Sequence, residues 1–379
     1  AAAARAVQAA NVHPGQIATL IIPADCAWND STAPLEAQDM PESLRVPVAN
    51  IKQTAALLRN GKTTIMLMGN TALTEKCLEL ADQLSQATGV RLYCDTFTAR
   101  LPRGAGRCSI EKLGYFAEQA TEQIKDAEQL VMVGTTAPVG FFAYPGKVSE
   151  FYPADSVLHT LAEVQHDAEQ ALTDLVAELD AGKFAPRRIK LQKPQLATGE
   201  LNLKAVGQGF AALLPTDAIV VDESATSGAY TSALSATAEP HDWLSLTGGS
   251  IGYGLPLSIG TAVACPERKT ICLQGDGGAM YTNQALWTMA REQLNVCVVI
   301  FANRKYQILQ IELARVGAQS MSPRTLDMLD LSNPDLDFVK MAESMGVKAT
   351  RATTADEFNQ QFEAAMQTPG PRLIEVMLD

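Results

Sequence analysis

The sequence predicts an α/β fold with two doubly wound parallel-sheet domains and a short N-terminal remnant of another domain. Short apolar runs alternate with amphipathic helical segments, and this alternation occurs twice along the chain. A basic, Pro-containing stretch separates the two series. The 379 residues, of which 47% are hydrophobic and 19% charged, suffice for two or three domains with real cores. We therefore expect a remnant and linker at 1–40, a Rossmann-like central domain at 41–182, a linker at 183–200 and a further domain at 201–379.

The first residues predict a helix, a Pro-Gly turn and a strand in "QIATLIIPAD", residues 16–25. A helix and one strand cannot bury both their faces by themselves. We therefore expect the chain to start partway through a domain, with a polar linker after it.

The central domain predicts a series of strands separated by helices. The segment 74–89 places Cys77, Leu80, Ala81 and Leu84 on one helical face and ends at Gly89. The continuous apolar run at 63–69 predicts a buried strand, and the segments 90–95, 127–135 and 156–162 continue the series of predicted strands. The turn "LMGNTAL" has a single glycine and no G-x-G-x-x-G pattern.

The last domain repeats the pattern, with helices between its strands. The predicted strands are 218–224, 270–276, 296–303 and 372–379.

Composition excludes several classes of partner. The formal net charge of −12 argues against nucleic acid and anionic membranes. No run reaches the roughly 18 apolar residues of a membrane span, and the first residues lack the apolar centre of a secretory signal. The seven scattered cysteines contain no C-x-x-C pair, which favours reduced thiols in a cytoplasmic protein.

Two polar residues follow successive predicted strands of the last domain. Asp276 ends the run "TICLQ" inside a Gly-Asp-Gly sequence, and Asn303 ends "VCVVIFA". Ligands of open parallel sheets bind beyond the carboxyl ends of the strands. A carboxylate, an amide oxygen and a backbone carbonyl suit Mg²⁺, and glycines with a helix starting near Ala279 suit a phosphate. The pattern predicts a diphosphate held through Mg²⁺.

The spacing resembles a known motif. Twenty-five residues, comprising one helix and one strand, separate Gly277 from Asn303. This resembles the thiamine-diphosphate (ThDP) motif, and "GGSIGYGLPLSIGTAVACPERKTICLQGDGGAMYT", "ALWTMAREQLNVCVVIFANRKYQIL" and "PGPRLIEV" extend the likeness to the acetolactate synthase and benzoylformate decarboxylase group. The likeness is weaker in the central domain, and "PGQIATLIIPAD" resembles the end of the family's first, pyrimidine-binding domain.

The resemblance assigns roles to residues of the last domain. Asp276, the Asn303 side chain and the Lys305 carbonyl would bind Mg²⁺. Ile251, in "GGSIGYG", would press the cofactor into a V shape, and the Gly249 carbonyl and Ile251 amide would pair with the aminopyrimidine. The remaining cofactor-binding candidates are Thr226, Ser227, Gly275, Gly277, Gly278, Ala279 and Tyr306. Tyr306 and Gln307 follow the metal ligands and could either face the substrate or pack at the start of a helix.

The family also uses a Glu of its first domain to activate the cofactor. No residue of this sequence matches it, so we expect the 379-residue chain to be inactive alone and to need its first domain, either upstream or on a separate chain. The expected reaction is decarboxylation of a 2-oxo acid with carboligation, as in acetolactate synthase, by a homodimer or homotetramer. Two alternatives stay open: simple decarboxylation as in benzoylformate decarboxylase, and a non-catalytic ThDP- or nucleotide-binding remnant.

Several departures from the family bear on these alternatives. Ala302 replaces the first of two Asn residues, no His stands at the benzoylformate decarboxylase position in "TTAPVGFFAYPGK", and no Gln-Trp pattern follows Asn303. FAD or ADP in the central domain is a family possibility, but we favour a purely structural role for that domain.

Overall fold

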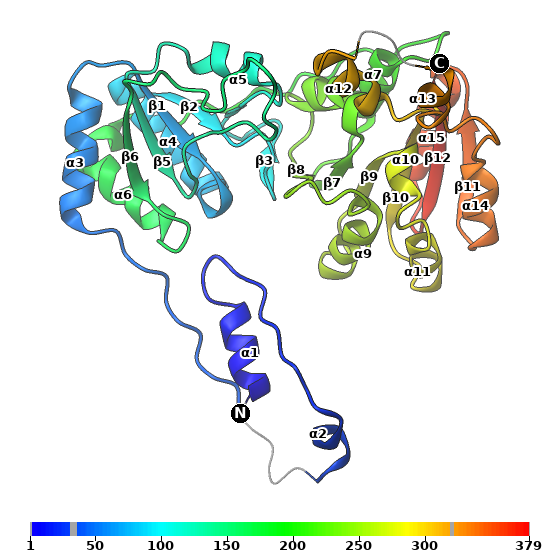
Figure 1. The fold of residues 1–379 in the computed structure, drawn as a ribbon, viewed down its shortest axis with the longest axis horizontal. Helices are drawn as coiled ribbons and strands as arrows, with labels where there is room; N and C mark the ends of the chain where they lie inside the picture. The colour runs from blue at the N-terminus through cyan, green and yellow to red at the C-terminus, as the bar shows by residue number, and fades with distance from the viewer. Residues whose placement is uncertain (1, 31–35, 319–321, 379) are drawn as a thin grey trace. The chain divides into compact units, whose positions relative to one another are not determined.

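A computed structural model describes residues 2–30, 36–318 and 322–378. The chain divides into two compact units (Figure 1). Unit 1 comprises Ala1–Thr96, Ile110–Ala143 and Val148–Pro186, and unit 2 comprises Phe97–Ser109, Tyr144–Lys147 and Arg187–Asp379. No helix of the described residues is both long and apolar enough to cross a bilayer.

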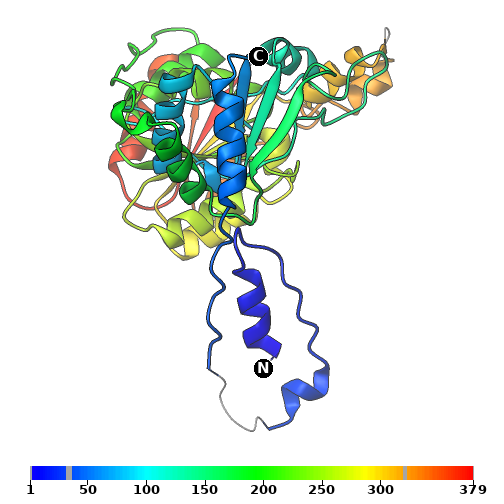
Figure 2. The same ribbon diagram turned by 90° about the vertical axis from the view of Figure 1, so that its left-hand side faces the viewer.

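The N-terminal segment differs from its prediction. It forms the helices α1 (Ala2–Ala10) and α2 (Ala24–Trp28), joined by extended chain (Figure 2). The strand expected at 16–25 is absent from the described secondary structure, and Ile17 and Ile21 are exposed. A strand needs a neighbour for its backbone hydrogen bonds, and this run has none among the described residues.

Unit 1 is a five-stranded parallel sheet with the strand order β4-β2-β1-β5-β6. Its helix α4 begins after Thr74, whose side chain accepts a hydrogen bond from Cys77 N, and ends at Gly89 with a left-handed φ of 79°. The four apolar side chains predicted for the inner face of this helix are all buried. α5 packs on one face, while α6 contacts both α3 and α4. The elements are α3 (Val48–Arg59), β1 (Thr64–Met68), α4 (Glu75–Thr88), β2 (Arg91–Cys94), β4 (Glu111–Lys112), α5 (Ala117–Ile124), β5 (Gln129–Val133), β6 (Val157–Ala162) and α6 (Ala168–Glu178).

Unit 2 contains a seven-stranded sheet with the order β11-β12-β10-β9-β7-β8-β3. Its central strands are continuous apolar runs because both faces are covered. One core contains side chains of α7 and α15, and the other contains side chains of α9, α11 and α14. The strands are β3 (Leu101–Arg103), β7 (Ala218–Glu223), β8 (His241–Ser245), β9 (Thr270–Gly275), β10 (Val296–Ala302), β11 (Lys348–Ala352) and β12 (Arg372–Met377). The helices are α7 (Leu203–Leu213), α8 (Ala229–Ser235), α9 (Gly254–Ala264), α10 (Asp276–Ala279), α11 (Ala285–Arg291), α12 (Gln307–Arg315), α13 (Pro323–Asp327), α14 (Phe338–Ser344) and α15 (Ala355–Gln367).

The strand β3 departs from the expected domain division. Residues 97–109 lie inside the predicted central domain, yet β3 pairs antiparallel with β8 at the edge of the unit 2 sheet. The Arg103 guanidinium lies 4.8 Å from the centre of the Trp243 ring, which fixes the strand there. A three-residue run containing Pro102 lacks a strand pattern but is compatible with an edge strand.

The strand order positions the site. The chain runs outward from β7 to β8, then returns to β9 on the other side of β7 and continues to β10. The order therefore reverses between β7 and β9, and ligands of such sheets bind at this reversal, beyond the carboxyl ends.

Candidate cofactor site

Three neighbouring strand ends bring most of the predicted site residues together. Glu223, the last residue of β7, is level with Gln274 of β9, and Gly275 is level with Phe301 of β10. Asp276 and Asn303 thus follow adjacent strands at the same edge of the sheet.

Asp276 is a buried carboxylate held by backbone groups. Its Oδ1 accepts a hydrogen bond from Gly277 N (2.8 Å) and its Oδ2 accepts one from Arg304 N (2.6 Å). Its side chain forms no ion pair among the described residues. Burial raises the pKa of Asp276, against the opposing effect of these N–H donors. The site therefore has a buried negative charge without a cation beside it, which a divalent ion would neutralise.

The turn after β10 holds the other two predicted metal ligands. Arg304 has a left-handed φ of 56°, which directs its N–H toward Asp276. The Asn303 Oδ1 accepts a hydrogen bond from Lys305 N (3.2 Å). Lys305 forms a β-bridge with Asp330, so the turn is fixed from both sides.

The glycines after β9 pack closely against their surroundings. A Cβ added at Gly277 would lie 2.4 Å from Cε1 of Tyr306, so that ring covers this glycine. A Cβ at Gly278 would lie 2.8 Å from side-chain atoms of both Glu223 and Gln274. The helix expected near Ala279 is instead the single turn α10, and α11 begins only at Ala285. One turn carries little of a helix dipole, so the Gly277–Ala279 backbone amides are the groups relevant to a phosphate.

Thr226 and Ser227 lie in a 3₁₀ turn, Ala225–Ser227, directly after β7. Ser227 is buried and its N–H donates to Ser224 O (3.0 Å), while Thr226 is half-buried. A Cβ at Gly275 would lie 4.0 Å from Ser224 O, so this turn lies beside the end of β9.

The loop that carries Ile251 has an exposed tip. Gly248 and Gly249 have left-handed φ angles, and the Ile251 side chain is 56% exposed. The Ile251 N–H donates to Gly249 O (3.0 Å). The two groups that the family resemblance assigns to the aminopyrimidine are therefore bonded to each other here, so the Ile251 N–H must leave the Gly249 carbonyl before it can donate to another partner.

The sequence reasoning missed Glu223, Gln274 and Tyr253. The Glu223 carboxylate is buried, and it accepts hydrogen bonds from the N–H groups of Gly252 (2.5 Å) and Gly254 (2.6 Å). Burial raises the pKa of Glu223. Glu223 could have been identified from the sequence, because it is an acid at the last position of a buried apolar strand.

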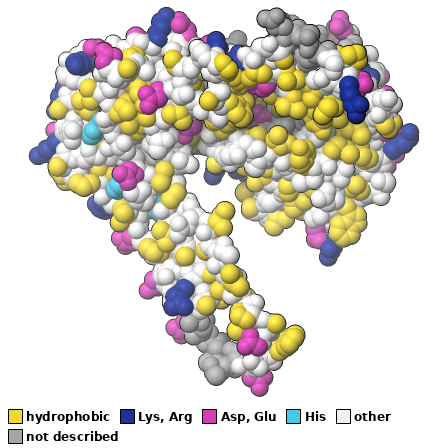
Figure 3. Space-filling view, viewed as in Figure 1, with side chains coloured by type: hydrophobic (Ala, Val, Ile, Leu, Met, Phe, Trp, Pro, Cys, Tyr) yellow, Lys and Arg dark blue, Asp and Glu magenta, His cyan; other side chains and the backbone are white. Residues whose placement is uncertain are grey.

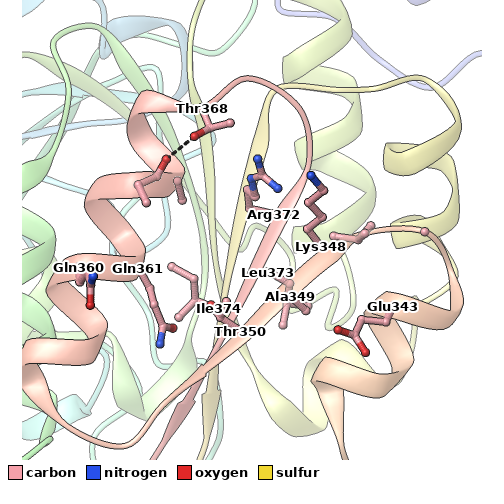
Figure 4. Close-up of a pocket in the computed structure, with 14 residues that line it drawn as sticks. Glu343, Lys348, Ala349, Thr350, Gln360, Gln361, Thr368, Arg372, Leu373 and Ile374 are labelled. Carbon is pink, nitrogen blue, oxygen red and sulfur yellow. Dashed lines mark hydrogen bonds between the residues drawn. The ribbon is translucent and has the colours of Figure 1, made fainter.

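A hollow of about 730 Å³ lies elsewhere in unit 2 (Figure 4). Lys348 and Arg372, the first residues of β11 and β12, both line it, together with Gln361 and Thr368 of the α15 region. It therefore lies at the amino ends of these strands and contains none of the predicted site residues.

The corresponding edge of the unit 1 sheet contains an acid. A Cβ at Gly69 would lie 2.2 Å from Asp95 Oδ2, and the Thr135 hydroxyl donates to Asp95 Oδ1 (2.9 Å). Burial raises the pKa of Asp95 to about 6. Asp95 therefore lies beside the turn that follows β1.

Comparisons with known proteins identify the family of this chain. The family described as "Thiamine pyrophosphate enzyme, C-terminal TPP binding domain" matches residues 226–376. The "Putative acetolactate synthase large subunit IlvX" of Mycobacterium tuberculosis is 46% identical over 376 residues, which are 99% of this chain and 72% of that protein. The acetolactate synthase isozyme 1 large subunit of Escherichia coli K12 is 23% identical over 356 residues, 87% of this chain and 61% of that protein.

The fold is shared with solved structures. The thiamine diphosphate-dependent 4-hydroxybenzoylformate decarboxylase of Rhodococcus jostii RHA1 superposes with a TM-score of 0.74 at 22% identity, over 90% of this chain and 66% of that one. On the evidence of its sequence relatives, the chain belongs to the thiamine-diphosphate-dependent enzymes, in the group related to acetolactate synthase large subunits.

Proposed function

We propose that this chain binds ThDP through Mg²⁺ at the carboxyl ends of β7, β9 and β10 and acts on 2-oxo acids with carboligation, as an acetolactate synthase-like enzyme. The observation that carries the proposal is the buried Asp276 carboxylate, which has no cationic partner among the described residues and lies one strand from Asn303.

The residues at this edge of the sheet suit Mg²⁺ and the diphosphate of ThDP. Asp276, the Asn303 amide oxygen and the Lys305 carbonyl would hold Mg²⁺, because all three are hard oxygen donors. The Gly278 N–H and the hydroxyls of Thr226 and Ser227 would bind the diphosphate oxygens, with Gly277 and Ala279 alongside, because the N–H groups of these two residues already donate to Asp276 and Gln274. When bound, ThDP supplies the electron sink for loss of CO₂ from a 2-oxo acid.

The loop residues would orient the rest of the cofactor. The exposed Ile251 side chain is available as an apolar support, and its branched Cβ restricts its rotamers. The Gly249 carbonyl and Ile251 N–H would exchange their mutual hydrogen bond for bonds to the ligand.

Cofactor binding is the first test of this proposal. In isothermal titration calorimetry we expect ThDP to bind in the presence of Mg²⁺ and to bind far more weakly with EDTA. Asp276→Ala should abolish the Mg²⁺ dependence and weaken binding by at least about 100-fold, since it removes a charged ligand. Glu267→Ala, which removes an exposed acid before the amino end of β9, is the matched control and should bind normally. Equal binding by Asp276→Ala and wild type would refute the metal site.

Product analysis separates the reactions. With pyruvate as the probe, carboligation gives acetolactate and simple decarboxylation gives acetaldehyde. Decarboxylation is the alternative because the benzoylformate decarboxylase of Pseudomonas aeruginosa is 32% identical over 181 residues, 47% of this chain. Acetaldehyde alone would replace the proposed carboligase with this alternative. ThDP binding with neither product, in the native assembly, would favour a non-catalytic ThDP-binding protein.

We also propose that the protein self-associates as a homodimer or homotetramer. Hydrophobic side chains are exposed over α9 and α11 (Figure 3). They include Val263, Met280, Tyr281 and Trp287, which are 39–63% exposed. Apolar patches of this kind commonly mark protein interfaces. Sedimentation equilibrium should give a dimer or tetramer mass, and a monomer at micromolar concentration would contradict the proposal.

A further inference from the structure

We propose that Glu223 is a positioning residue that joins the Ile251 loop to the diphosphate-binding turn, so that the two halves of the cofactor site are held in one geometry. The inference rests on the proposed ThDP site, because that site gives both elements their function.

Glu223 holds the base of the Ile251 loop at two points. Its Oε1 accepts the Gly252 N–H and its Oε2 accepts the Gly254 N–H, on either side of Tyr253. Hydrogen bonds to a buried carboxylate are stronger than those between neutral groups. The residue directly after Ile251 is therefore fixed to the end of β7.

The same carboxylate contacts the turn after β9 through Gln274. With the Gln274 amide nitrogen facing Glu223, it donates to Oε2 (3.2 Å), and the Gln274 amide oxygen accepts the Ala279 N–H (3.3 Å). A Cβ at Gly278 would lie 2.8 Å from Glu223 Oε1, so α10 lies directly over this pair. Glu223 and Gln274 are also neighbours across β7 and β9.

Two further bonds complete the link. The Tyr253 hydroxyl donates to Asp222 O (2.8 Å) and lies 3.2 Å from Leu244 O. The Thr282 hydroxyl, just beyond α10, donates to Gly252 O (2.7 Å). The loop base is thus bonded to β7, to β8 and to the segment after α10, while the loop tip at Ile251 stays exposed.

The chemistry explains why the residue is a Glu. Two N–H groups converge on one side chain, and only a carboxylate offers each of them its own acceptor oxygen while still accepting from Gln274. A Gln at this position would turn an NH₂ group toward one of these donors. One of the two N–H donors would then lack an acceptor in the protein interior, which shifts the loop.

The test compares Glu223→Gln with wild type in ThDP titrations at saturating Mg²⁺. We expect Kd to rise roughly 10- to 100-fold, the effect of losing one hydrogen bond to a buried charge. Hydrogen exchange of the cofactor-free protein should also accelerate at the Gly252 and Gly254 amides, which reports the loop independently of turnover. Gln274→Met removes the contact between Glu223 and the turn after β9 without changing the charge, and it should also raise the Kd of ThDP. This second variant provides the test if Glu223→Gln folds poorly.

Glu375→Gln is the matched control. Glu375 is a fully buried acid of the same sheet, on β12, and it bonds to Arg351 Nε (2.8 Å) instead of the loop. The Glu375→Gln substitution should lower the stability of the protein but leave the Kd of ThDP unchanged. If both Glu223→Gln and Gln274→Met bind ThDP with wild-type affinity, this inference is overturned, while the proposed function stands. Failure of wild type to bind ThDP would instead overturn the proposed function and this inference with it.

Discussion

At the scale of single residues, the buried acids of unit 2 differ in what balances their charge. Asp242 is held by Arg268, Arg100 and Arg107, and these guanidinium groups lower its pKa. Asp276 and Glu223 meet only N–H donors and an amide, and burial raises the pKa of both. The ion-paired acid stabilises the fold by itself, whereas the other two retain charge that a ligand or a loop can use.

Ile251 gives a prediction at this scale. Its side chain is 56% exposed, so Ile251→Ala should change the free energy of unfolding of the cofactor-free protein by no more than about 0.5 kcal/mol. ThDP affinity should fall because an apolar support is lost. Urea unfolding and calorimetry measure the two quantities. Val48→Ala, at the exposed first position of α3 in unit 1, should change neither, and an unaltered ThDP affinity in Ile251→Ala would argue against its role.

At the scale of elements, the one-turn helix α10 is tightly constrained. Its glycines face Tyr306 on one side and the Glu223–Gln274 pair on the other. The sequence explains this only in part. The Gly-Asp-Gly pattern predicted a close backbone approach, but the groups that approach come from β7 and from the turn before α12, and no local pattern encodes that pairing.

Gly277 provides the test. Gly277→Ala would place a methyl group 2.4 Å from the Tyr306 ring, so the ring or the turn must move, and we expect a loss of about 1–3 kcal/mol in stability together with weaker ThDP binding. Gly260→Ala in α9 is the control, since nothing lies within 4 Å of the added Cβ, and it should be neutral or stabilising. Adding Tyr306→Ala should recover part of the stability lost in Gly277→Ala. No recovery would mean that another contact causes the strain.

Strand prediction succeeded where apolar residues dominate the sequence of the strand. The runs at β1, β2, β5, β6, β7, β9, β10 and β12 were all expected. The strands β3, β4, β8 and β11 were missed, because they are short or carry polar residues such as His241 and Lys348. The expected strand at 16–25 failed for the opposite reason: its pattern is apolar, but a strand also requires a neighbour.

At the scale of the whole molecule, the two units should respond differently to pH. Burial raises the pKa of Asp95 in unit 1 from 3.8 to about 6, and lowers that of His241 in unit 2 from 6.5 to about 4. Between about pH 4 and 6 the folded unit 1 keeps a proton that the unfolded chain has lost, so Asp95 makes unit 1 less stable as pH rises. In unit 2 the unfolded chain binds the extra proton, so His241 makes it less stable as pH falls.

Replacing Asp95 isolates one of these effects. In Asp95→Asn the side chain keeps an oxygen for the Thr135 hydroxyl. The free energy of unfolding of this variant, relative to that of wild type, should be higher at pH 7 than at pH 4 by on the order of 1 kcal/mol. Urea unfolding at both pH values measures this difference. Asp126→Asn should show the reverse sign, because Arg91 lowers the pKa of that exposed acid. A pH-independent difference for Asp95→Asn would show that Asp95 titrates normally.

The strand β3 limits how this protein can be divided. Because residues 97–109 belong to unit 2 while the chain on both sides belongs to unit 1, no single cut separates two complete folding units. An expression fragment starting at residue 187 would lack β3 and leave the outer edge of β8 unpaired, an edge prone to aggregation. Gene fusions or domain exchanges that treat the cofactor-binding part as a module must therefore include this segment.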